Sequence, residues 1–150
     1  MARQIRRILY ATDFSKASAR ALDEAVSLAK QNHAELLVVH VIEPAGQYAA
    51  GEDFGGAELY MKLEEAAEQD AQRSMQKLMG KLKQARVNAK SLLLKGLAPE
   101  QIVKAARSRK ANLIVIGTHG RTGLSKFFMG SIAGRVVALA SCPVVTVRGK

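Results

Sequence analysis

The chain has 150 residues, 48% of them hydrophobic and 24% charged, which suits one compact domain and excludes a disordered or fibrous chain. No apolar stretch reaches the roughly 20 residues that a membrane-spanning helix needs, and no signal-type cleavage site follows the N-terminal Met1 to Arg7. We therefore expect a soluble cytoplasmic protein, whose net charge of +10 makes an anionic partner a reasonable starting hypothesis.

In the first half of the chain, apolar runs alternate with segments of helical periodicity. Ile8–Ala11 predicts a first strand, and the alanines that recur at helical spacing after Ser15 predict a helix. The run from Leu36 to Ile42 is apolar except for His40, which is typical of a strand covered on both faces. Residues 43–57 contain four glycines and predict the longest irregular connection.

A long helix is predicted next, from about Leu59 to Val87, with Met61, Met75 and Met79 as core residues. Cys142, the only cysteine, excludes an internal disulfide, and its small apolar neighbours predict a buried, unreactive thiol.

The second half continues the alternation. Leu92–Leu94 predicts a third strand, Gly96 a turn, and Pro99 the first residue of a helix. Leu113–Ile116 is a fully apolar fourth strand, and a glycine-rich segment from 117 to 130 leads into a last helix. Val144–Val147 predicts the fifth strand.

Five strands separated by four helices predict an α/β fold in which the strands pair in parallel through right-handed crossovers. We expect a single domain over residues 1–150, with a doubly wound, Rossmann-like sheet in the order 3-2-1-4-5 and helices on both faces. Ligands of such folds bind beyond the carboxyl ends of the strands, where the strand order reverses. The segments after the first, second and fourth strands are therefore the candidate site.

The segment after the fourth strand carries the clearest motif. Gly117, Gly120, Gly130 and Ser131 follow the spacing G-x2-G-x9-G-[S/T], which is neither a Walker A sequence nor a dinucleotide fingerprint. Glycines allow backbone N–H groups to approach an anion, and the N-terminus of the next helix adds further free N–H groups. Ser131 is expected to cap this helix or to contact a phosphate, and Arg121 and Lys126 add positive charge.

With four further motifs in order, this chain resembles the universal stress protein family in its ATP-binding branch, over essentially its whole length. These motifs are the opening Ile8–Ser15, the strand end Val39-His40-Val41, the turn Gly96-Leu97-Ala98-Pro99, and the closing Cys142-Pro143-Val144. The chain departs from the family pattern at Gly134, where relatives often carry a larger residue, and in residues 43–57, so the cover over the nucleotide is not predicted.

The resemblance implies a homodimer, paired through Val144, Val145, Thr146 and Val147, that binds ATP together with Mg²⁺ and acts as a nucleotide-dependent switch with little or no hydrolysis. It places Asp13 near the ribose or the metal-bound phosphates and the Val41 backbone at the adenine edge. The implied nucleotide-binding residues are Ala11, Thr12, Asp13, Val41, Gly117, Thr118, His119, Gly120, Arg121, Gly130, Ser131 and Ile132.

Asp13, His40 and His119 each have an interpretation simpler than ligand contact. Asp13 is as well explained by capping of the first helix as by ligand contact. His40, inside an apolar strand, is expected to be a hydrogen-bonded core residue, and His119 a turn residue that points to solvent. The three histidines are too scattered to form a metal cluster.

Two other functions stay open. Slow ATP hydrolysis or autophosphorylation could use a loop hydroxyl such as Thr118, Thr122, Ser125 or Ser131, although no residue stands out as a base. Nucleic acid or another polyanion could bind residues 71–150, which hold 16 basic residues and one acidic residue, whereas residues 1–70 hold 7 and 12. For Arg73, Lys77 and Lys81, which share one helix face, a solvated surface is the simpler interpretation.

Overall fold

The computed structural model describes residues 3–44, 56–119 and 129–149, so Gly120, Arg121, Lys126 and nearly all of the 43–57 connection lie outside it. Five parallel strands form one sheet in the order β3-β2-β1-β4-β5, as predicted. The elements are β1 (Arg7–Ala11), α1 (Lys16–Asn32), β2 (Glu35–Ile42), α2 (Gly56–Gln84), β3 (Ala89–Lys95), α3 (Ala98–Ser108), β4 (Leu113–Gly117), α4 (Ser131–Leu139) and β5 (Val144–Val147).

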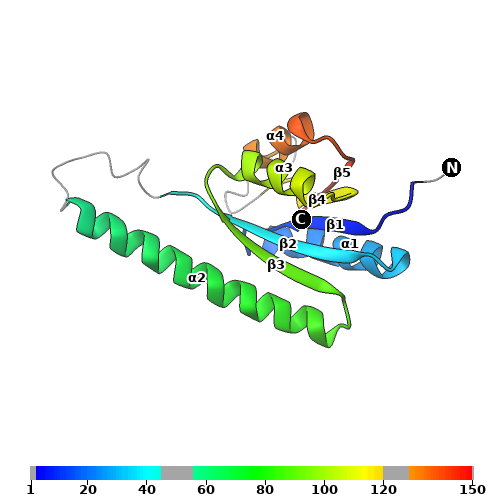
Figure 1. Cartoon of the computed structure of the whole chain (residues 1–150), viewed down its shortest axis with the longest axis horizontal. Helices are drawn as coiled ribbons and strands as arrows, with labels where there is room; N and C mark the ends of the chain where they lie inside the picture. The colour runs from blue at the N-terminus through cyan, green and yellow to red at the C-terminus, as the bar shows by residue number, and fades with distance from the viewer. Residues whose placement is uncertain (1–2, 45–55, 120–128, 150) are drawn as a thin grey trace.

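The helices cover both faces of this single α/β domain, and Figure 1 shows α3 and α4 together on one side of the sheet. Alternate residues of the strands pack into two separate cores. Leu9, Leu37 and Ile114 face α3 and α4, whereas Ile8 and Tyr10 face α1 and α2. Because β1 is central and buried on both faces, the segment that follows it lies where the two layers of helices meet.

Strand β3 is longer than the predicted Leu92–Leu94. It pairs with β2 from Ala89 to Lys95, although Lys90 and Ser91 are exposed. β3 lies at the edge of the sheet, and an edge strand accepts polar residues that a search for apolar runs overlooks.

Helix α2 has 29 residues, but only Ala71, Met75 and Leu82 are buried. Figure 1 shows its C-terminal part beside β3 and its N-terminal part projecting beyond the sheet. The prediction that Met61 is a core residue is therefore wrong, because its side chain is 64% exposed, whereas Met75 is buried as expected. No helix in the described part of the chain is long and apolar enough to span a membrane.

Candidate functional site

One pocket of about 590 Å³ opens across the carboxyl ends of β1, β2 and β4. This volume falls within the roughly 300–1,000 Å³ typical of small-molecule sites. Ten of the twelve sequence-predicted residues line it, and the other two, Gly120 and Arg121, lie outside the described residues. The ten are Ala11, Thr12, Asp13, Val41, Gly117, Thr118, His119, Gly130, Ser131 and Ile132.

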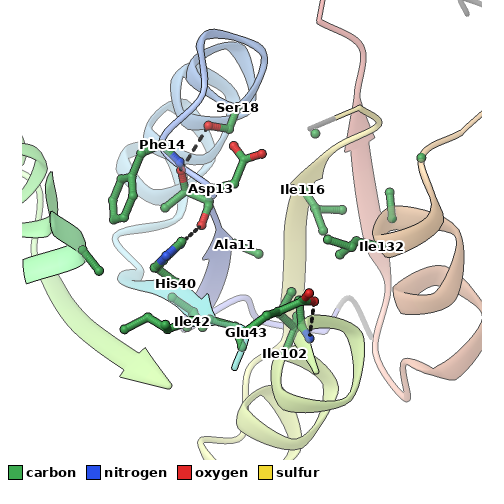
Figure 2. Close-up of a pocket in the computed structure, with 18 of the residues that line it drawn as sticks. Ala11, Asp13, Phe14, Ser18, His40, Ile42, Glu43, Ile102, Ile116 and Ile132 are labelled. Atoms are coloured by element: carbon green, nitrogen blue, oxygen red, sulfur yellow. Dashed lines mark hydrogen bonds between the residues drawn. The ribbon is translucent and has the colours of Figure 1, made fainter. Parts of the chain in front are cut away.

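The turn between β1 and α1 holds Asp13 at the centre of the pocket (Figure 2). The Ser15 amide donates to Asp13 Oδ1 (2.9 Å), and the Phe14 amide donates to Thr12 Oγ1 (2.9 Å). These two bonds stabilise Phe14 at a φ of 64°, which a bulky residue rarely adopts. Ser15, not Asp13, caps α1 by accepting from the Ser18 amide. Asp13 therefore shapes the turn and also faces the pocket.

Buried polar side chains gather at this pocket. Thr12, Ser18 and Thr118 are the polar residues that the described part of the chain buries, and all three line it. The hydroxyl oxygens of Thr12 and Ser18 lie 3.0 Å apart, and the Tyr10 hydroxyl donates to the Ser18 carbonyl oxygen (2.7 Å). Because burial of polar groups is costly without partners, this network gives the pocket floor a fixed arrangement.

His40 is hydrogen-bonded, as predicted, but it is half-buried and lines the pocket rather than lying in the core. Its Nδ1 lies 2.7 Å from the Thr12 carbonyl oxygen. A carbonyl can only accept, so the imidazole carries a proton on Nδ1. The Phe14 and His40 rings contact each other with centroids 4.5 Å apart and planes tilted by 39°.

The prediction that His119 points to solvent is wrong. Its Nδ1 lies 3.0 Å from Thr118 Oγ1, and its Nε2 is shielded from water without a hydrogen-bond partner among the described residues. A shielded, unpaired ring nitrogen in a pocket wall is suited to a polar ligand, because burial without a partner costs free energy.

Helix α4 begins at the pocket, and no side chain in the described part of the chain caps its first-turn amides. Gly130 is the N-cap residue and Ser131 the first helical residue, so Ser131 does not cap the helix as expected. Such an N-terminus offers free N–H groups and positive partial charge to an anion. Of the two roles predicted for the Ser131 hydroxyl, only ligand contact is compatible with this position.

Two further parts of the chain line the pocket and were not predicted from the sequence: the residue that follows β2, and helix α2. Glu43, directly after β2, accepts a hydrogen bond from the Ala98 amide (3.3 Å) and so joins the end of β2 to the start of α3 (Figure 2). Its position directly after a predicted strand could have identified Glu43 as a candidate site residue. Asp70 and Ser74 of α2 also line the pocket, and nothing in their local sequence indicates this.

The charges of the described pocket wall are all negative. Asp13, Glu43 and Asp70 line it, whereas none of its described residues is a lysine or arginine. No group of three or more metal-binding side chains occurs in the described residues. A polyanionic ligand would therefore need backbone amides, a cation of its own, or basic residues from outside the described part.

The fold and the pocket together define a doubly wound α/β domain with a ligand site at the point where strand order reverses. The sequence matches the model of the universal stress protein family over residues 4–148, and the chain belongs to that family.

Known proteins agree with this membership over nearly their whole length. A universal stress protein of Thermus aquaticus is 40% identical over 141 residues, which cover 94% of this chain and 97% of the relative. The solved structure of protein MJ0577 superimposes with a TM-score of 0.85 at 26% identity and covers 99% of both chains. The universal stress protein of Archaeoglobus fulgidus, solved in complex with dAMP, shares the fold (TM-score 0.68, 22% identity, 96% of this chain and 98% of that one).

Proposed function

We propose that this protein binds ATP in the pocket at the carboxyl ends of β1, β2 and β4 and acts as a nucleotide-dependent regulator in the stress response. The observation that carries the proposal is the convergence of the residues after three strands and of the uncapped α4 N-terminus on one pocket of about 590 Å³. Because ATP is abundant in the cytoplasm, we place its action there.

The two ends of the pocket suit the two ends of a nucleotide. The first-turn amides of α4, from Ser131 onward, and the shielded His119 Nε2 would hold phosphate oxygens. Asp13 would accept from the ribose hydroxyls, and Val41, Ile102 and Ile116 provide apolar surface for the base. Gly120 and Arg121 belong to this proposal on the resemblance alone.

Magnesium belongs to the proposal for an electrostatic reason. A triphosphate beside Asp13, Glu43 and Asp70 would be repelled unless a cation lay between them. Mg²⁺ typically uses one or two carboxylates together with phosphate oxygens, and Asp13 is the carboxylate that the resemblance places near the ribose or the metal-bound phosphates. Asp13 would then hold the ion only together with the nucleotide.

Regulation rather than turnover is what the resemblance to universal stress proteins implies, and Asp13, Glu43 and Asp70 are the carboxylates of the described wall that hydrolysis would have to use to activate water. Thr118 is buried and lies against His119, and Ser131 is exposed at the start of α4. Among the described hydroxyls Ser131 is therefore the candidate acceptor for slow phosphate transfer, whereas Thr122 and Ser125 lie outside the described residues. Incubation with γ-labelled ATP would reveal transfer as labelled protein and slow hydrolysis as released phosphate.

Isothermal titration of the purified protein with ATP, with and without Mg²⁺, tests the proposed function. We expect saturable binding that weakens when the metal is chelated. Absence of both heat and thermal stabilisation at millimolar ATP would contradict the proposal. Retention on DNA that falls steeply with salt, without ATP binding, would instead favour the polyanion alternative.

A further inference from the structure

The pocket reaches beyond the proposed ATP site, onto the other face of the sheet. Val41, Ile102 and Ile116 belong to the core layer of α3 and α4, where the nucleotide is proposed to lie. Phe14 packs in the layer of α1 and α2, and His40 precedes Val41 on the opposite face of β2. Figure 2 shows the Phe14 and His40 rings on one side of Asp13 and Ile116 and Ile132 on the other.

The α2 side of the pocket consists of Phe14, His40, Ala67, Asp70, Ala71 and Ser74. Its α2 residues follow one another at intervals of three, one and three positions, so they share one helix face. Both alanines line the pocket with short side chains, Ala67 at an exposed position and Ala71 at a buried one. Apart from the charge of Asp70, nothing in the proposed ATP site uses these residues.

This side has the chemistry of a nucleobase site. The tilted pair of Phe14 and His40 presents aromatic surface on which a planar ring can stack. The Ser74 hydroxyl makes no hydrogen bond within the described part of the chain, so it can pair with a ring nitrogen. Asp70, which forms an ion pair with Arg73, has a carboxylate that can accept from an exocyclic amino group.

We infer that the α2 side of the pocket binds a second nucleobase, so that the preferred ligand is a dinucleotide with two bases joined through phosphates. One continuous pocket runs past Ala11 and Thr12 between the two sides, and a single ligand can follow it. The first nucleoside occupies the α4 side, and the second base lies between the aromatic pair and α2. This inference rests on the proposed function, because it places the first nucleoside in the ATP site.

The decisive comparison uses two probes with the same number of phosphates, diadenosine tetraphosphate and adenosine tetraphosphate, titrated calorimetrically with Mg²⁺. They share one adenosine and four phosphates; the dinucleotide adds the second adenosine, whereas the free terminal phosphate of adenosine tetraphosphate carries additional negative charge, so the α2 substitutions below separate the base from the charge. Because stacking of one base on aromatic side chains contributes about 1–3 kcal/mol, we expect the dinucleotide to bind about ten-fold more tightly or better.

Substitutions on α2 locate the second base. Ala67→Phe, at an exposed helix position, fills the space opposite the rings and should remove the advantage of the dinucleotide without changing the affinity for adenosine tetraphosphate. Ala66→Phe is the matched control, because Ala66 is also exposed and does not line the pocket. Ser74→Ala should reduce the advantage several-fold, and thermal melting of each variant verifies that it is folded.

Equal affinities for the two probes would overturn the inference and leave the ATP proposal intact. An advantage that survives in Ala67→Phe would also overturn it, because the second base would then lie elsewhere. Binding of neither probe nor ATP would contradict the proposed function itself, and this inference with it.

Discussion

Gly130 and Thr118 are in contact at the entrance of α4. The Gly130 amide donates to the Thr118 carbonyl oxygen at 2.6 Å, and a Cβ built on Gly130 would lie 2.8 Å from that same oxygen. The φ of Gly130 is −59°, so any residue could adopt its backbone conformation. The glycine is required by this close approach, which ties the end of β4 to the start of α4.

Gly130→Ala should therefore displace the start of α4 from Thr118 and weaken ATP binding by at least ten-fold. Contact between a methyl group and a backbone oxygen at this distance forces the backbone to move, and a site built from amides depends on their positions. Calorimetric titration measures the affinity, and chemical denaturation measures the loss of stability.

Gly134→Ala is the matched control, because Gly134 lies in the same helix and a Cβ there would meet nothing within 4 Å. This substitution should stabilise the protein by about 0.5–1 kcal/mol through the helix propensity of alanine, with ATP affinity unchanged. Equal loss of binding in both variants would mean that α4 as a whole, rather than the contact with Thr118, controls the site.

Asp13→Asn separates the two roles of Asp13. An asparagine oxygen can still accept from the Ser15 amide, so the turn and the thermal stability should change little. Loss of the negative charge should weaken Mg²⁺-dependent ATP binding by about ten-fold, the value of a charge-assisted hydrogen bond. Unchanged ATP affinity in a variant of unchanged stability would show that Asp13 serves only the turn.

The sequence predicted the sheet order and the location of the pocket because both follow from regularities of parallel sheets. Alternating apolar runs and helical periodicity require crossovers, and the residues after β1, β2 and β4 must then meet at one edge. The ten predicted residues that line the pocket were found in this way or through the family's glycine motif.

The other features of the site depend on tertiary packing, which the pattern of residues along the sequence does not reveal. Met61 and Met75 lie on the same helix, yet only Met75 reaches the sheet, because α2 extends past its edge. The orientation of His119 depends on a hydrogen bond with the adjacent Thr118 that its sequence context does not distinguish from a solvent-facing turn. Ser74 lines the pocket because α2 packs against β2 and β3, which its local sequence does not indicate.

Tyr10 makes stability sensitive to high pH. Burial raises the pKa of its phenol above the ordinary tyrosine value of 10.0, because the charged form is poorly solvated in the core. The folded state thus favours the neutral phenol, so this contribution to stability is complete below about pH 10 and is lost as the pH rises through the folded-state pKa.

Tyr10→Phe tests this directly by thermal melting between pH 8 and about pH 11. Near pH 8 the variant should be less stable by about 1 kcal/mol, because the hydrogen bond to the Ser18 carbonyl oxygen is lost. Above pH 10 the native protein should lose stability more steeply than the variant. Parallel pH profiles would assign the alkaline loss to other groups.

Cys142 is only partly buried, less than predicted, but desolvation raises the pKa of its thiol, in agreement with low reactivity. A rate of alkylation at pH 8 well below that of free cysteine, rising to the same limit in denaturant, is the expected result. Alkylation as fast as that of free cysteine would show that the thiolate is accessible and not disfavoured.

The proposed homodimer depends on the free edge of β5. The carbonyl oxygens of Pro143 and Val147 accept from β4, so in an alternating strand the amides of Val144 and Thr146 point away from β4.

Thr146→Pro would remove one of these outward amides without removing a bond to β4. If two copies pair along this edge, the variant should be monomeric in analytical ultracentrifugation, whereas Thr146→Ser, which keeps the amide, should stay dimeric. A native protein that is monomeric at micromolar concentration, or a dimer unaffected by the proline, would place the contact between copies elsewhere or exclude it.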